Sequence, residues 1–323
     1  MNTKIAFFDS KPYDEVTFNQ INEKFGFDIR YYKGNLNKDN VILTKSADVA
    51  CIFVNAVADA EVINELVNNG VKLIALRCAG YNNVDIKAAK DRIKVVRVPA
   101  YSPHAVAEHT LALMLTLNRK THKAYTRTRD GNFSLNGLLG FDMFEKTAGI
   151  IGTGKIAKIL IQILRGIGMN IIAFDLYPDY NFAKKYDVEY TTLDELYSRS
   201  DIISLHCPLT DDTHHLIGEN EFTQMKDGVY IINTARGAVI DECALVRHLA
   251  NGKLGGAGLD VFEEEPTISR ELYWMDNVVL TPHNATGTID TRIATAHEAS
   301  ENLIRFFNER YDISIVNPAV LKL

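Results

Sequence analysis

The chain has 323 residues, of which 46% are hydrophobic and 24% charged, as is typical of folded globular proteins. This composition excludes a disordered chain, a coiled coil and a collagen-like repeat, and the length predicts about two domains. The 35 basic and 41 acidic residues leave a formal net charge of −6, so we expect no binding to nucleic acid. No run of about 18 apolar residues occurs, so we also expect no membrane span.

The cysteines favour a reduced, cytoplasmic protein, because they show neither C-x-x-C spacing nor zinc-ligand spacing with histidines. The N-terminus reaches an aspartate and a proline too early for a signal peptide, which favours the same compartment. His104 and His109 are five residues apart on a predicted helix and lie on different faces, so we expect no bound metal. The four cysteines are Cys51, Cys78, Cys207 and Cys243.

In the first hundred residues, short apolar runs alternate with polar, helix-like segments, which predicts βαβ units and a parallel sheet. A long helix then begins near Ser102, with Pro103 at its first position and the apolar run 110–117 as its buried part. The charged segment 119–146 is interpreted as an excursion from the domain, directed towards a partner subunit. The predicted strands of this half are 4–8, 49–54, 72–76 and 95–98.

A second series of βαβ units begins at Thr147, and a strong helix is predicted near the C-terminus over 290–308. The two series together predict an α/β protein with parallel sheets. The predicted strands of the second series are 148–151, 170–174, 202–205, 229–233, 256–259 and 278–280.

The segment Gly152-Thr-Gly154-Lys-Ile-Ala157 matches the dinucleotide-binding pattern G-x-G-x-x-G/A. An apolar strand precedes it, a helix follows, and the next strand ends at Asp175, 23 residues after Gly152. Gly152 permits the tight turn, Gly154 lets the backbone approach a pyrophosphate, and Ala157 lets the helix pack on the strand. Free N–H groups at the helix N-terminus would face the phosphates. An ordinary strand–turn–helix that binds no nucleotide is the alternative.

Asp175 predicts that the cofactor is NAD rather than NADP. Its carboxylate would accept hydrogen bonds from the adenosine ribose and would repel a 2′-phosphate. The next three residues are Leu176, Tyr177 and Pro178, which include no arginine to bind such a phosphate.

Polar residues follow three predicted strands of the second half. Arg236 follows the first of these strands, Asp260 the second and His283 the third. Because ligands bind at the carboxyl ends of parallel strands, we expect these segments to converge on one crevice.

These residue types suit the reduction of a 2-oxo acid. A guanidinium can hold a carboxylate bidentately, and a protonated histidine can donate a proton to the carbonyl oxygen as hydride arrives. A carboxylate beside the histidine favours its imidazolium form. On spacing alone, Glu263, Glu264 or Glu265 could be that carboxylate, and Asp260 could instead cap a turn.

With these motifs, the sequence resembles the NAD-dependent D-2-hydroxyacid dehydrogenases over essentially the whole chain. The intervals of 29 residues from Arg236 to Glu265 and of 18 residues from Glu265 to His283 resemble those of the family. The resemblance implies that Arg236 binds and polarises the substrate and that His283 is the acid/base, assisted by Glu265. It also implies that Asp260 lies near the nicotinamide.

Within the family, the chain is most similar to the fermentative D-lactate branch, which implies NADH-dependent reduction of pyruvate to D-lactate. The resemblance implies that N–H groups of Ala79 and Gly80 hold the substrate carboxylate and that Tyr101 closes over it. The stretches that carry this resemblance are 76–85, 98–103, 107–109, 126–130 and 205–209. Further positions that match cofactor-lining residues of the family are Lys155, Ile156, Cys207, Pro208, Thr213, Thr234 and Ala235.

One departure bears on the substrate. Thr286 stands three positions after His283, where the lactate branch usually carries an aromatic residue. Without that aromatic wall, the alternative substrates are larger or more polar 2-oxo acids, such as 2-oxoisocaproate, phenylpyruvate or hydroxypyruvate. An NAD-sensing regulator on the same fold is an alternative of another class, although the intact Arg, Glu and His set argues against it.

The resemblance also implies two Rossmann-like or flavodoxin-like domains around a cleft. Residues 1–100 with 300–323 would form the substrate domain, and residues 101–299 the NAD-binding Rossmann domain. We further expect a homodimer, with the 119–146 excursion at the subunit contact.

Overall fold

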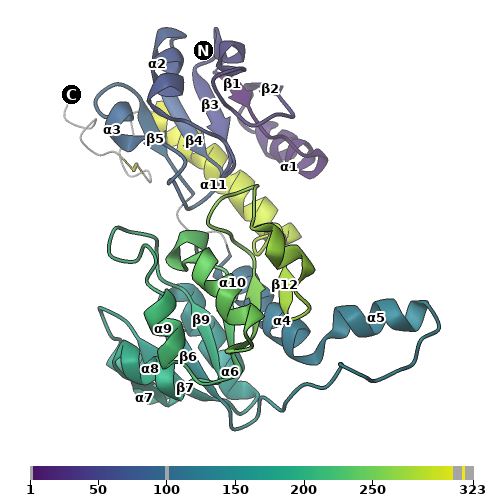
Figure 1. The fold of residues 1–323 in the computed structure, drawn as a ribbon. Helices are drawn as coiled ribbons and strands as arrows, with labels where there is room; N and C mark the ends of the chain where they lie inside the picture. Colours follow the sequence, from purple (N-terminus) through teal and green to yellow (C-terminus); the bar gives the residue numbers. More distant parts are fainter. Residues whose placement is uncertain (1–2, 99–101, 308–314, 317–323) are drawn as a thin grey trace. The chain divides into compact units, whose positions relative to one another are not determined.

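The computed structural model describes residues 3–98, 102–307, 315 and 316. The chain divides into two compact units, the first formed by Met1–Ser102 with Gly287–Leu323 and the second by Pro103–Thr286 (Figure 1). Both are α/β units with parallel sheets, as predicted, and no helix in the described part of the chain is long and apolar enough to cross a membrane.

The first unit is built on a five-stranded parallel sheet in the order β2-β1-β3-β4-β5. Helices α2 and α3 lie over one apolar core, whereas α1 packs against α11 over the other. The strands are β1 (Lys4–Phe7), β2 (Asp28–Tyr31), β3 (Val49–Ile52), β4 (Leu73–Leu76) and β5 (Lys94–Val96). The helices are α1 (Pro12–Asn22), η1 (Val41–Thr44), α2 (Ala60–Asn68), α3 (Ile86–Ala89) and α11 (Ile289–Phe307).

The second unit is built on a seven-stranded parallel sheet in the order β12-β11-β10-β9-β6-β7-β8. The strands β6 to β8 follow one another towards one edge and β9 to β12 towards the other, so the strand order reverses between β6 and β9. Such a reversal marks the usual ligand position of an open α/β sheet. Helices α4 and α6 cover one face, and α8, α9 and α10 cover the other. The strands are β6 (Thr147–Ile151), β7 (Asn170–Phe174), β8 (Val188–Tyr190), β9 (Ile202–Leu205), β10 (Val229–Asn233), β11 (Leu254–Leu259) and β12 (Val278–Leu280).

The remaining elements of this unit connect the strands. They are α4 (Pro103–Arg119), α5 (Thr121–Arg129), α6 (Lys155–Gly166), α7 (Tyr180–Tyr186), α8 (Leu193–Arg199), α9 (Glu219–Gln224), η2 (Gly237–Val239), α10 (Glu242–Ala250) and η3 (Arg270–Trp274).

Three elements are missing from the sequence prediction, because none of them carries a buried apolar run. Strands β2 and β8 are short edge strands with charged side chains, which is how natural sheets protect their edges. Helix α5 lies within the charged 119–146 segment, has no buried residue and extends away from the sheet of its unit (Figure 1).

Helix α11 belongs wholly to the first unit. It packs against α1 and β4, and its buried Ala296, Ala299 and Leu303 join the core of that sheet. The chain therefore returns to the first unit at Gly287, whereas the boundary expected from the sequence, near residue 299, falls inside this helix.

Candidate active site

The glycine-rich turn connects β6 to α6. Gly152 has a φ of +88°, and a Cβ there would lie 2.9 Å from the backbone nitrogen of Cys207 and from the carbonyl carbon of His206. Only glycine fits this approach to the loop after β9. A Cβ at Gly154 would meet nothing within 4 Å, so open space lies before the N-terminus of α6. Such space beside free N–H groups fits the pyrophosphate of a dinucleotide.

Asp175, directly after β7, is tied to the same turn. Its Oδ2 accepts hydrogen bonds from the backbone nitrogen of Thr153 at 2.5 Å and from Thr153 Oγ1 at 2.9 Å, and its Oδ1 accepts one from Tyr177 N at 2.8 Å. Partial burial works to raise the pKa of Asp175, but these hydrogen bonds outweigh it and hold the pKa below its ordinary value. The residue is therefore a fixed anion beside the glycine-rich turn.

The loop after β9 holds Cys207, Pro208 and Thr213. Thr213 Oγ1 donates to the carbonyl of Pro208 at 2.6 Å and accepts from the nitrogen of Thr210 at 2.8 Å, which closes the loop on itself. Burial raises the pKa of Cys207 to about 11, so its thiol is neutral and serves as an apolar surface. Lys155 is exposed in the first turn of α6, and Ile156 beside it is half-buried.

The segment after β10 is held by its own side chains and by α4. Thr234 is buried, and its hydroxyl lies 2.9 Å from that of Thr110. Asn233 Oδ1 accepts the N–H of Ala235 at 3.0 Å, while Asn233 Nδ2 donates to the carbonyl of Arg236 at 2.9 Å. These bonds fix the turn from which the Arg236 side chain emerges.

Three adjacent strands, β10, β11 and β12, bring the segments of Arg236, Glu265 and His283 to one edge of the sheet. A Cβ at Gly237 would lie only 1.8 Å from the carbonyl carbon of Phe262, so this glycine lets the Arg236 turn touch the segment after β11. Phe262 in turn donates its N–H to Glu265 Oε1 at 3.1 Å.

Arg236 is half-buried, and its Nη1 donates to the carbonyl of Ala235 at 2.6 Å. A carbonyl carries no net charge, and no carboxylate of the described residues forms an ion pair with this guanidinium. The positive charge is therefore available to an anionic ligand.

His283 pairs with Glu265. The imidazole Nδ1 lies 2.8 Å from Glu265 Oε2, and the two side chains are 27% and 23% exposed. Nδ1 faces the carboxylate, and no described residue forms a hydrogen bond with the second ring nitrogen, Nε2, which can therefore face a ligand. Of the three candidate acids, Glu265 is therefore the partner of the histidine.

Glu263 has a different partner. Its Oε1 lies 2.7 Å from His215 Nε2, and its Oε2 accepts the N–H of Glu242 at the start of α10. Glu242 Oε2 accepts the N–H of Glu263 in return at 3.2 Å. His215 therefore braces the loop that carries Glu265.

Asp260 is fully buried below the His283 segment. Its carboxylate accepts hydrogen bonds from the Thr281 hydroxyl at 2.6 Å and from the N–H groups of Asn284 and Ala285 at 2.9 Å. Burial works to raise the pKa of Asp260, but His109 and these donors outweigh it and hold the pKa below its ordinary value. The contacts lie on both sides of His283, which has a φ of +52°.

His109 on α4 was not among the predicted site residues. Its Nε2 lies 3.1 Å from Thr281 Oγ1 and 3.4 Å from Asp260 Oδ1. It therefore supports the aspartate that holds the His283 segment. The sequence around His109 does not predict this contact, because Thr281 lies 172 residues further along the chain.

The predicted substrate residues lie in the first unit, after β4. The carbonyl of Ala79 accepts a hydrogen bond from Arg97 Nη1 at 2.7 Å, and the carbonyl of Gly80 accepts one from Cys78 Sγ at 3.2 Å. Tyr101 lies outside the described residues.

Arg77, which directly follows β4, is buried. Its Nη2 donates to the carbonyl of Phe8 at 2.8 Å, and its Nη1 pairs with Asp14 at 3.2 Å. The Arg77 guanidinium therefore has a structural role in the first unit, because its removal from these contacts would leave Asp14 as an unpaired buried charge.

Comparison with known proteins identifies the family of the chain. Residues 111–285 match the family model of the D-isomer specific 2-hydroxyacid dehydrogenase NAD-binding domain. D-lactate dehydrogenase of Escherichia coli K12 is 46% identical over 93% of this chain and 95% of its own length. The 2-hydroxyacid dehydrogenase homolog 1 of Schizosaccharomyces pombe is 43% identical over 97% of this chain and 99% of its own.

Solved structures give the same result. The apo-structure of the Escherichia coli D-lactate dehydrogenase matches with a TM-score of 0.90 and 46% identity, covering 97% of this chain and 100% of that one. The D-lactate dehydrogenase of Aquifex aeolicus, solved with NAD and lactic acid, matches with a TM-score of 0.84 and 32% identity over 95% and 96% of the two chains. The chain therefore belongs to the family of NAD-dependent, D-isomer-specific 2-hydroxyacid dehydrogenases.

Proposed function

We propose that the protein reduces pyruvate to D-lactate with NADH. The pairing of His283 with Glu265, beside the available Arg236, carries the proposal, because it supplies an acid and an anion anchor at one sheet edge. The relatives named D-lactate dehydrogenase, one of them solved with NAD and lactic acid, support the substrate.

Each of the three residues has one role. Arg236 binds the substrate carboxylate and polarises the carbonyl, because a guanidinium can form two parallel hydrogen bonds. Glu265 holds the imidazole through Nδ1 and stabilises its protonated form. His283 then donates the Nε2 proton to the carbonyl oxygen, and in the reverse direction it removes the proton of the hydroxyl. The bound cofactor supplies or accepts the hydride.

The cofactor would lie along the carboxyl ends of β6, β7 and β9. Gly152, Gly154, Lys155 and Ile156 would hold the pyrophosphate, and Asp175 the ribose. Asp260 would act chiefly by holding the His283 segment near the nicotinamide, because its oxygens already accept three hydrogen bonds from that segment. The residues that would line the rest of the cofactor are Cys207, Pro208, Thr213, Thr234 and Ala235.

The first unit would serve as the substrate domain. Ala79 and Gly80 would offer backbone N–H groups to the substrate carboxylate, and Tyr101 would close over it.

We further propose a cytoplasmic homodimer. Helix α5, within segment 119–146, has no buried residue, and the segment exposes several large apolar side chains. Such exposure is typical of a surface that contacts a partner. The exposed apolar side chains are Tyr125, Phe133, Leu135, Leu139 and Phe144.

The first test is the rate of NADH oxidation with pyruvate, measured beside 2-oxoisocaproate, phenylpyruvate and hydroxypyruvate, with the product assayed for its D-isomer. We expect the highest kcat/KM with pyruvate. A higher kcat/KM with a bulky or polar 2-oxo acid would make that acid the substrate and would indicate that Thr286 determines the specificity. No turnover with any of them would favour the NAD-sensing alternative.

A further inference from the structure

Two adjacent histidines and a glutamate lie together in the second unit, outside the proposed catalytic set. His214 and His215 stand in the loop after β9, and Glu263 stands in the segment after β11. One potential ligand atom from each of the three side chains lies within 4.8 Å of the other two. The side chains of His215 and Glu263 are 35% and 31% exposed, and His214 is exposed. None of the three belongs to segment 119–146, which we propose for the subunit contact.

Hydrogen bonds fix the backbone that carries the two histidines. The N–H of His214 donates to the carbonyl of Thr210 at 2.9 Å, and the N–H of His215 donates to that of Ala238 at 2.8 Å. His215 has a φ of +51°, a left-handed conformation that persists only where the surrounding structure determines it. The two imidazole rings are stacked, with their centroids 4.0 Å apart. The loop therefore presents two imidazoles side by side.

Glu263 is held next to them with one oxygen turned towards His215. Its Oε2 accepts the N–H of Glu242 at 3.2 Å, which leaves Oε1 to lie 2.7 Å from His215 Nε2. The imidazole of His214 forms no hydrogen bond or ion pair with any described residue. A fixed carboxylate oxygen, a histidine that faces it and a histidine without a polar partner thus share one place on the surface.

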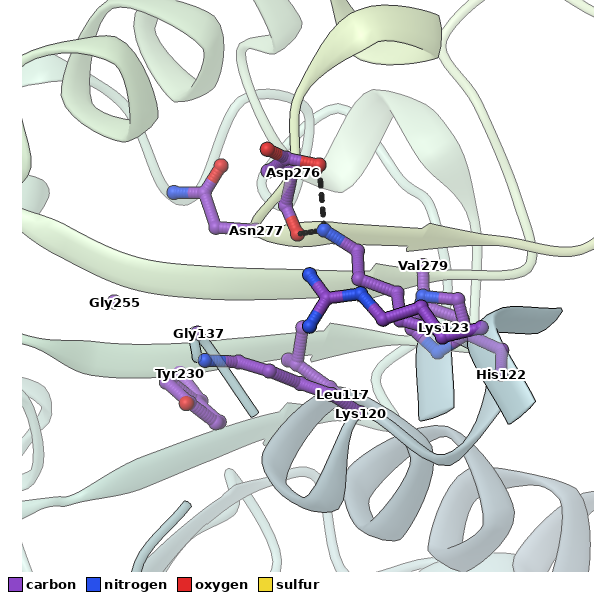
Figure 2. A pocket seen from close by; sticks show the side chains of 11 residues that line it. Leu117, Lys120, His122, Lys123, Gly137, Tyr230, Gly255, Asp276, Asn277 and Val279 are labelled. Atoms are coloured by element: carbon purple, nitrogen blue, oxygen red, sulfur yellow. Dashed lines mark hydrogen bonds and ion pairs between the residues drawn. The ribbon is translucent and has the colours of Figure 1, made fainter. Parts of the chain in front are cut away.

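His122 shows the opposite surroundings for a histidine. It lines a cavity together with Lys120 and Lys123, as Figure 2 shows. Burial, and then the charge of Lys123, lower the pKa of His122. The lysines there would repel a metal ion, whereas Glu263 brings a negative charge to His214 and His215.

We propose that His214, His215 and Glu263 form a binding site for a divalent transition-metal ion such as Zn²⁺. Two imidazole nitrogens and one carboxylate oxygen suit zinc, with water in the fourth tetrahedral position. Ligand atoms at about 2.0–2.2 Å from such an ion lie about 3.4 Å from one another. Rotation of the exposed His214 side chain, which no hydrogen bond to a described residue restrains, brings its nitrogen to that distance.

Binding would exchange one hydrogen bond for three bonds to the ion. His215 Nε2 and Glu263 Oε1 would both turn to the metal, and the His215 proton would then reside on Nδ1. The ion would join the loop after β9 to the segment after β11. The expectation of no bound metal considered only local spacing in the sequence, whereas Glu263 lies 48 residues after His215. The proposal goes beyond the proposed reaction, because none of the three residues belongs to the catalytic set.

Isothermal titration calorimetry with Zn²⁺ tests the proposal on the full-length protein, after its metal has been removed with EDTA and the chelator by desalting. We expect saturable binding of one ion per chain. Saturating Zn²⁺ should also raise the thermal midpoint by about 2 °C or more, because the ion binds the folded state. His214→Gln and Glu263→Gln should each weaken binding about tenfold or more, since the first removes a ligand and the second its charge.

The matched control is His297→Gln, which removes an exposed histidine from α11 and should bind Zn²⁺ as the wild type does. Cys243→Ser and His283→Gln should also bind normally, which separates this site from the exposed thiol and from the catalytic pair. Unchanged turnover of His214→Gln in EDTA shows that this variant folds. The proposal is overturned if the wild type shows no saturable binding, if His214→Gln binds as tightly as His297→Gln, or if Cys243→Ser or His283→Gln loses binding.

Discussion

His283 Nδ1 lies 2.8 Å from Glu265 Oε2, and the histidine holds a left-handed backbone conformation with a φ of +52°. Such a conformation costs about 1–3 kcal/mol and persists only where the surrounding structure determines it. Asp260 meets this requirement, because its carboxylate binds Thr281 on one side of His283 and Asn284 and Ala285 on the other. The buried carboxylate of Asp260 thus holds the His283 segment so that the imidazole faces Glu265.

Glu265→Gln should lower kcat for NADH-dependent reduction between about 10²- and 10⁴-fold, because the imidazolium loses its charged partner. The affinity for NADH should not change, since Glu265 is not among the proposed cofactor contacts. Stopped-flow and steady-state rates measure the first effect, and fluorescence titration of NADH the second. Glu264→Gln is the control, because Glu264 is exposed and neighbours Glu265 in sequence. Equal losses in both variants would contradict the assignment of Glu265.

Gly154→Ala should weaken NADH binding about tenfold or more while leaving the thermal midpoint unchanged or slightly raised. The added methyl group meets no protein atom within 4 Å, so it would occupy the space proposed for the pyrophosphate. Gly166→Ala at the other end of α6 is a matched control, because a Cβ there also meets nothing within 4 Å. Unchanged NADH affinity in Gly154→Ala would place the pyrophosphate elsewhere.

Asp175→Asn should raise the ratio of kcat/KM with NADPH to that with NADH at least about tenfold. The substitution removes a negative charge that would repel the 2′-phosphate. Initial rates with both cofactors at fixed pyruvate measure the ratio, and Asp194→Asn on α8, an exposed aspartate, should leave it unaltered. If the ratio stays at its wild-type value, Asp175 does not select the cofactor.

Asp260→Asn should lower the free energy of unfolding by about 1–3 kcal/mol near neutral pH, because a charge-assisted hydrogen-bond cluster is lost. The folded-state pKa of Asp260 lies below its unfolded value of about 3.9. The carboxylate therefore stabilises the fold fully above that pH, and its contribution is lost as the pH falls through the folded pKa. Urea unfolding at a series of pH values should show the difference from wild type shrinking in acid. A difference that does not depend on pH would exclude the charge as its cause.

The local pattern of the sequence was sufficient to predict the cofactor turn. The order of glycine turn, helix and strand lies within the 24 residues from Gly152 to Asp175, so short-range spacing predicts their contact, and the structure joins Asp175 to Thr153 of this turn. The alternation of apolar runs likewise predicted the parallel sheets, because a strand buried on both faces needs an apolar run. Strands β2 and β8 escaped prediction since edge strands do not need one.

Only the tertiary structure decided which charged groups pair. Glu263, Glu264 and Glu265 are chemically equivalent in sequence, but the turn after β11 directs Glu265 to His283 and Glu263 to His215. Arg77 follows a strand as Arg236 does, yet packing around Asp14 buries it and leaves Arg236 available. Sequence thus determined the elements and the kinds of residues at their ends, because these depend on local spacing. The pairing of the charges depends on side-chain directions set by contacts between distant segments, and those exist only in the folded chain.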